Sequence, residues 1–153
     1  MNTNTVERAL RTIEQCDDPD KLQQIMQNAR ERGVTEVRDA AFRRLCAVKP
    51  SAEPGSLEHA VWQSVYALEE VLKEERKKTT LLARTRQKIG RDGEQKTVHD
   101  LVLKGSSAGF GMLMERGMLD LTFEALALKF PTRFDVTVLG SARSRLESAG
   151  YPC

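Results

Sequence analysis

The chain of 153 residues has no long apolar run and few of the residues that build reactive centres. A membrane-spanning helix needs roughly 20 apolar residues in a row, and no stretch approaches that length. The opening residues, MNTNTVERALRTIEQ, carry neither the basic start nor the apolar core of a signal peptide. We therefore expect a cytoplasmic protein with no membrane partner.

Cysteine and histidine are scarce, with three and two copies. Cys16, Cys46 and Cys153 form an odd and widely spaced set, which indicates reduced thiols and not disulfides. His59 and His99 lie far apart in the sequence, whereas a zinc site needs more ligands at closer spacing. The sequence therefore predicts no metal site and no cofactor.

Two short segments share features with catalytic motifs. Asp92, Glu94 and Lys96 follow the acid-x-acid-x-lysine order of many metal-dependent nucleases, but a glycine interrupts them and no strand is predicted there. The glycine-rich segment 105–111 lacks the spacing of a phosphate-binding loop. We predict a turn and an inter-helix linker at these places, no catalytic residue and a non-enzymatic protein. An active site assembled from residues distant in sequence stays open.

Apolar residues recur at helical spacing, and no stretch alternates as a half-buried strand does. Helix starts are indicated at Asn4, at Asp18 followed by proline, and at Thr35. We predict an all-α multi-helix bundle with one long central helix and a C-terminal helical hairpin. Its parts are a three-helix unit (1–49), a proline- and glycine-containing linker (50–55), and the long helix with a small C-terminal helical region (56–153).

The longest predicted element starts after Ser56, a good N-cap residue. No proline or glycine interrupts residues 57–89, so we predict one helix of roughly 50 Å at 1.5 Å per residue. A turn from Gly90 to Glu94 and a new helix start at Thr97 follow. The first half of the long helix carries an apolar seam that could pair with a second copy of the chain, formed by Val61, Val65, Leu68 and Leu72.

The second half of this helix is strongly basic. Between Arg76 and Arg91 there are seven basic residues and no acidic one. On one continuous helix, five cations would form a stripe opposite the apolar face. Such a stripe can neutralise successive phosphates without reading a base sequence. Because no aromatic residue interleaves with the cations, duplex backbone contact is favoured over base stacking on single strands. The stripe consists of Lys73, Lys77, Arg84, Lys88 and Arg91.

The C-terminal region predicts two helices, 122–130 and 136–148, joined by a short break that contains Pro131. This outline is typical of a helix-turn-helix, in which Arg143 and Arg145 of the second helix would face DNA. An ordinary αα-hairpin that closes the core would give the same pattern, so both interpretations stay open.

The hypothesis from the sequence is an accessory or regulatory protein that binds the phosphate backbone of nucleic acid, with duplex DNA favoured over RNA. The predicted contacts are the basic stripe together with Arg143 and Arg145. The alternative is a non-enzymatic dimeric helical scaffold or adaptor, in which the apolar seam forms the dimer and the charges serve solubility.

Overall fold

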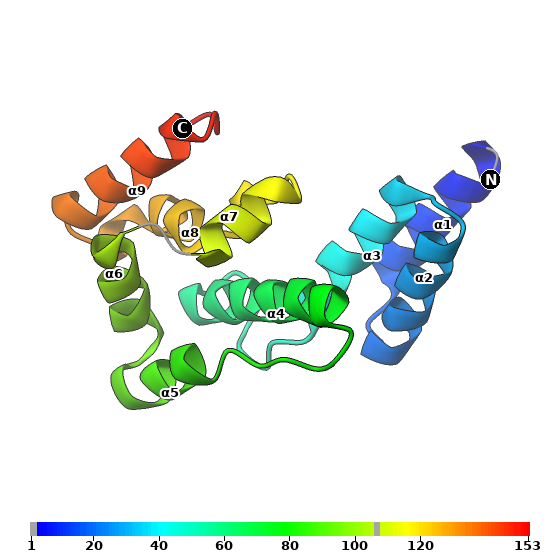
Figure 1. The fold of residues 1–153 in the computed structure, drawn as a ribbon, viewed down its shortest axis with the longest axis horizontal. Coiled ribbons are helices and arrows are strands. Elements are labelled where there is room, and N and C mark those ends of the chain that lie inside the picture. The colour runs from blue at the N-terminus through cyan, green and yellow to red at the C-terminus, as the bar shows by residue number, and fades with distance from the viewer. Residues whose placement is uncertain (1–2, 106–107) are drawn as a thin grey trace. The chain divides into compact units, whose positions relative to one another are not determined.

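The computed structural model describes residues 3–105 and 108–153, and this part of the chain is all-helical with no strand. Figure 1 shows the elements in chain order. The chain divides into two compact units, Met1–Ser51 and Ala52–Cys153, and the boundary falls within the predicted linker. The all-α prediction is confirmed.

The first unit consists of three short helices, α1 (Thr3–Gln15), α2 (Pro19–Glu31) and α3 (Thr35–Val48). Helix α3 packs against both α1 and α2. The N-cap of α2 is the predicted one, because the Asp18 carboxylate accepts a hydrogen bond from the Asp20 N–H at 3.0 Å. The side chains that fill this core are Ile13, Leu22, Met26, Ala29, Val37, Ala41, Phe42, Leu45 and Cys46.

The second unit contains six α-helices and two short 3₁₀ turns in its described residues. Helix α6 contacts α4, α5, α8 and α9, and helix α8 contacts α4, α6 and α9, so α6 and α8 lie at the centre of the unit. In chain order the elements are α4 (Leu57–Arg76), α5 (Ala83–Asp92), α6 (Glu94–Lys104), α7 (Ala108–Glu115), η1 (Leu119–Leu121), α8 (Phe123–Lys129), η2 (Pro131–Arg133) and α9 (Val136–Ser148).

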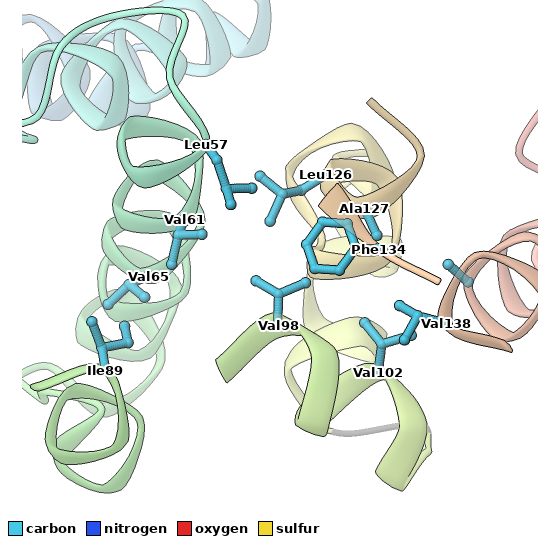
Figure 2. Close-up of a cluster of buried hydrophobic side chains, with 11 residues drawn as sticks. Leu57, Val61, Val65, Ile89, Val98, Val102, Leu126, Ala127, Phe134 and Val138 are labelled. Carbon is cyan, nitrogen blue, oxygen red and sulfur yellow. The ribbon is translucent and has the colours of Figure 1, made fainter. Parts of the chain in front are cut away.

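One apolar core holds the second unit together, and Figure 2 shows its side chains. Val98 of α6 lies near the Phe134 ring, which packs beside Leu126 and Ala127. Burying a side chain of this size contributes about 1.5–3 kcal/mol. The whole cluster is Leu57, Val61, Val65, Ile89, Val98, Val102, Leu126, Ala127, Phe134, Val138 and Ala142.

The prediction of one continuous helix over residues 57–89 is wrong. Helix α4 ends at Arg76, because Lys77 adopts a left-handed conformation with φ 60° and ψ 24°. The chain then runs back along α4 before α5 begins at Ala83 (Figure 1). Three consecutive cations at 76–78 repel one another, and the two threonines that follow are β-branched and favour helix less. Neither signal is as plain in a sequence as a proline or glycine.

The connection between α5 and α6 is shorter than predicted. Helix α5 continues to Asp92 and α6 starts at Glu94, so the break is Gly93 alone, with φ 88°. The Thr97 hydroxyl donates to the Gly93 carbonyl at 2.8 Å inside α6, so the predicted helix start at Thr97 is wrong. A single residue with positive φ is enough to turn the chain, and glycine adopts that conformation without strain.

The C-terminal region forms the predicted pair of helices, α8 and α9, which pack against each other. The Thr122 hydroxyl accepts from the Ala125 N–H at 3.1 Å, and the Asp135 carboxylate accepts from the Val138 N–H at 3.0 Å. These caps fix where both helices begin. The predicted linker 105–111 is shorter, because α7 starts at residue 108. Ser106 and Ser107 lie outside the described residues.

Candidate nucleic-acid interface

The predicted basic stripe does not lie on one helix face. Lys73 belongs to α4, Lys77 is the left-handed residue at its end, and Arg84, Lys88 and Arg91 belong to α5. Because the chain reverses between α4 and α5, the helical projection that aligned these five cations does not apply across the break. Their surroundings therefore have to be considered one by one.

Four cations gather where α4 ends. Lys73, Arg76, Lys77 and Lys78 are all exposed, and none of them forms an ion pair within residues 3–105 and 108–153. Two carboxylates lie between them in sequence: Glu74 is held by Arg116 at 2.6 Å, and Glu75 is exposed. We call Lys73, Arg76, Lys77 and Lys78 the basic turn. Arg76 and Lys78 were not chosen from the sequence, since a continuous helix would have placed them off the stripe.

The negative end of the α4 helix dipole stabilises some of these cations. Cations in the last turn of a helix are favoured by about 0.3–1 kcal/mol each, and Lys73 and Arg76 lie in that turn. Lys77 and Lys78 follow the last helical residue, and both remain exposed. The basic turn thus holds more positive charge than the end of the helix needs.

Lys88 has two carboxylate partners in the chain, with which its predicted phosphate contact would compete. Its ammonium lies 2.8 Å from Asp92 and 2.7 Å from Asp100. The hydrogen bond with Asp100 is the main reason that the pKa of Lys88 is raised, and the same bond lowers the pKa of Asp100. The Lys88 ammonium also lowers the pKa of Asp92. These three side chains join α5 to α6 across Gly93.

Two further arginines of α5 differ in their surroundings. Arg86 donates to Glu69 at 2.7 Å and 2.6 Å, and its guanidinium lies over the rings of Trp62 and Tyr66 at 5.3 Å and 5.6 Å. The hydrogen bond with Glu69 raises the pKa of Arg86 more than burial lowers it. Among the described residues, the only ion pair of Arg91 is with Asp92, at 3.3 Å, and 68% of its side chain is exposed. Arg86 is structural, whereas Arg91 can reach a ligand.

Arg145 has a structural role in the chain, and its contact with DNA stays a prediction. Its guanidinium donates to Glu124 and, at 3.0 Å, to the Val102 carbonyl. Glu124 is 6% exposed, and a buried carboxylate requires a cation or several donors. Arg145 therefore ties α9 to α8 and α6. Arg143 on the same helix is exposed, as the helix-turn-helix interpretation expected.

The apolar seam predicted for a dimer is used within the chain. Val61 and Val65 have no exposed surface and belong to the core in Figure 2, and Leu72 is 9% exposed. Val61, Val65 and Leu72 are therefore occupied within the chain, whereas Leu68 is half-buried. A dimer stays a prediction.

The two acidic side chains of the acid-x-acid-x-lysine segment form contacts within the fold. Glu94 accepts a hydrogen bond from the Trp62 indole N–H at 3.1 Å, and Asp92 is paired with Lys88. His99 bonds Asp100 at 2.9 Å. Among the described residues, no group of three or more histidine, cysteine or carboxylate side chains could hold a metal ion.

The arrangement offers an exposed positive turn on a packed helical unit. None of the helices in the described part of the chain is long and apolar enough to cross a membrane. Comparison with known proteins gives no further identification: no family model, no curated protein and no solved structure matches this chain.

Proposed function

We propose that this protein binds nucleic acid through the phosphate backbone, with the basic turn as the principal contact. One observation supports the proposal. The four cations of the basic turn are exposed and have no acidic partner in the described residues, while Lys88, Arg86 and Arg145 are each neutralised by a carboxylate. Unneutralised cations close together attract a polyanion and release its counterions.

The expected binding is independent of base sequence. The basic turn contains no aromatic side chain that could stack on a base, and its lysines act as flexible point charges. Arg84, Arg91 and Arg143 are also exposed and stay predicted as additional contacts. With four phosphates neutralised, log K should fall with log salt at a slope of about −3.6 on duplex DNA.

The test is fluorescence anisotropy with labelled duplex DNA, duplex RNA and single-stranded DNA at low and moderate salt. We expect binding that weakens steeply with salt, and a Lys77→Glu/Lys78→Glu variant that binds at least about tenfold more weakly. This pair is preferable to a change at Lys88, because losing Lys88 would also break the contact between α5 and α6.

A matched control carries the same change of charge elsewhere. Lys21→Glu/Lys129→Glu alters two exposed lysines outside the basic turn. If this control weakens binding as much as the variant of the turn, net charge and not the basic turn is responsible. Absence of binding to all three nucleic acids at low salt would contradict the proposed function.

A further inference from the structure

The second unit contains a cavity of about 670 Å³ that the proposed function does not use. Its wall is formed by α4, α6, α7 and α8 together with the start of α5. Sites that bind small molecules usually have about 300–1,000 Å³ and an apolar lining. Most of the wall is apolar, and its larger side chains are Leu68, Leu82, Leu101, Phe110, Leu113 and Phe123.

A buried hydroxyl in the wall has no partner. Ser64 of α4 is 2% exposed, and its hydroxyl oxygen forms no hydrogen bond in the described structure. A serine hydroxyl in a helix commonly donates a hydrogen bond to a backbone carbonyl of the preceding turn, but the Ser64 hydroxyl does not. Leaving a buried hydroxyl unbonded costs free energy, so the chain by itself does not fully satisfy this part of the wall.

The charged side chains in the wall favour an anion. Arg84 of α5 and Lys104 at the end of α6 both line the cavity and are exposed to solvent. Glu124 also lines it, but Arg145 neutralises this carboxylate from α9. Within the described part of the wall, the net charge that a ligand meets is therefore positive.

We propose that the cavity binds a single-chain fatty acid. The apolar chain would occupy the space between Leu68, Leu101 and Phe123, and the carboxylate would lie at Arg84 and Lys104, where it can stay partly hydrated. Long basic side chains hold an anion in this way at the edge of an apolar site, while their stems cover apolar surface. A neutral lipid of the same length lacks the partner for these two cations.

The experiment uses the full chain and cis-parinaric acid, a fatty acid whose fluorescence rises in an apolar environment, below its micelle concentration. We expect saturable binding, displacement by oleate and clearly poorer displacement by oleyl alcohol, which differs in the head group alone. Leu101→Trp should abolish binding, because Leu101 is half-buried in the wall and the larger indole side chain would fill the cavity. Circular dichroism and thermal unfolding check that this variant folds.

A charge variant keeps the inference testable if Leu101→Trp does not fold. Lys104→Glu should weaken fatty-acid binding by roughly fivefold or more, because it replaces an attraction at the edge of the cavity by a repulsion. Lys129→Glu is the matched control, since Lys129 is exposed and outside the wall, and it should bind as the unaltered chain does.

Three results would overturn the inference: no saturable binding, equal displacement by oleate and oleyl alcohol, or unchanged binding by a folded Leu101→Trp variant. The fatty-acid inference can be tested independently of the proposed nucleic-acid binding. Lys104→Glu should leave duplex DNA binding unchanged, and Lys77→Glu/Lys78→Glu should leave fatty-acid binding unchanged, because neither lysine of that pair lines the cavity.

Discussion

Arg86 of α5 donates two hydrogen bonds to Glu69 of α4, at 2.7 Å and 2.6 Å, across the break between the two helices. The same carboxylate accepts the backbone N–H of Leu82 at 2.9 Å, just before α5 begins. A single acidic side chain therefore supplies both a charge partner and a backbone acceptor to the start of α5. This arrangement stabilises the chain reversal that replaces the predicted long helix.

Loss of the Glu69 carboxylate should destabilise the second unit. In Glu69→Ala, Arg86 keeps a half-buried charge without its partner, and we expect the free energy of unfolding to fall by about 2–3 kcal/mol. This value lies below the usual cost of breaking a buried pair, because 31% of the Arg86 side chain is exposed to water. Urea denaturation followed by circular dichroism measures the change. Glu75→Ala removes an exposed carboxylate from the same helix and should have little effect.

Glycine at position 77 should stabilise the protein. Lys77 has φ 60°, a conformation that costs an L-residue roughly 1–2 kcal/mol and glycine almost nothing. Thermal unfolding of Lys77→Gly should give a higher midpoint than Lys77→Ala. Both variants lose the same charge, so both should weaken nucleic-acid binding alike. An equal midpoint for the two variants would show that the backbone at this position is not strained.

The ion pairs of Lys88 predict a loss of stability in acid. The pKa of Asp92 and of Asp100 is lowered in the folded chain, chiefly by hydrogen bonds with Lys88. A carboxyl group with a lowered folded pKa contributes stability that is complete above its unfolded pKa, about 3.9. That stability is lost as the pH falls below this value, because protonation breaks the pairs. The pKa of Lys88 is raised, so its contribution is complete below about pH 10.4 and is lost at higher pH.

Lys88→Met tests this contribution. Without the ammonium, the pKa of each aspartate should return toward its ordinary value, so the variant should be less stable near neutral pH and less sensitive to acid. Urea midpoints compared at about pH 7 and about pH 3 measure both effects. If the variant and the unaltered chain lose the same stability on acidification, other carboxylates control it.

Arg143 and Arg145 should respond to mutation in different ways. Arg145→Ala leaves the buried Glu124 carboxylate without its cation, and we expect a loss of about 3 kcal/mol in unfolding free energy. Arg143→Ala changes an exposed side chain and should alter stability by less than about 0.5 kcal/mol. Chemical denaturation compares the two. If Arg145→Ala keeps full stability but loses DNA binding, the second helix acts as a recognition helix.

Local signals in the sequence predicted much of the secondary structure. The caps at Asp18 and Ser56 lie where the sequence indicated, because each places a side-chain oxygen next to the free N–H groups of a helix start. The two C-terminal helices were likewise predicted from their spacing and from the break at Pro131. A cap depends on neighbouring residues alone, so it can be recognised without the fold.

The errors came from partners that are distant in sequence. No local breaker marks Lys77, and the contacts that hold the chain reversal join Glu69 to residues on the next helix. Arg145 looked free because Glu124 and Val102 belong to other helices. Charge periodicity shows which face of a helix a cation occupies, but it cannot show which carboxylate the fold places opposite.

The division of the chain at residue 51 has a consequence for inheritance. Each unit keeps its own buried core, the first built from residues 13–46 and the second from residues 57–146. A recombination event between the codons of Ser51 and Gly55 would leave each set of core residues together on one side of the junction. Such an event would also keep the basic turn and the cavity together, because both belong to the second unit.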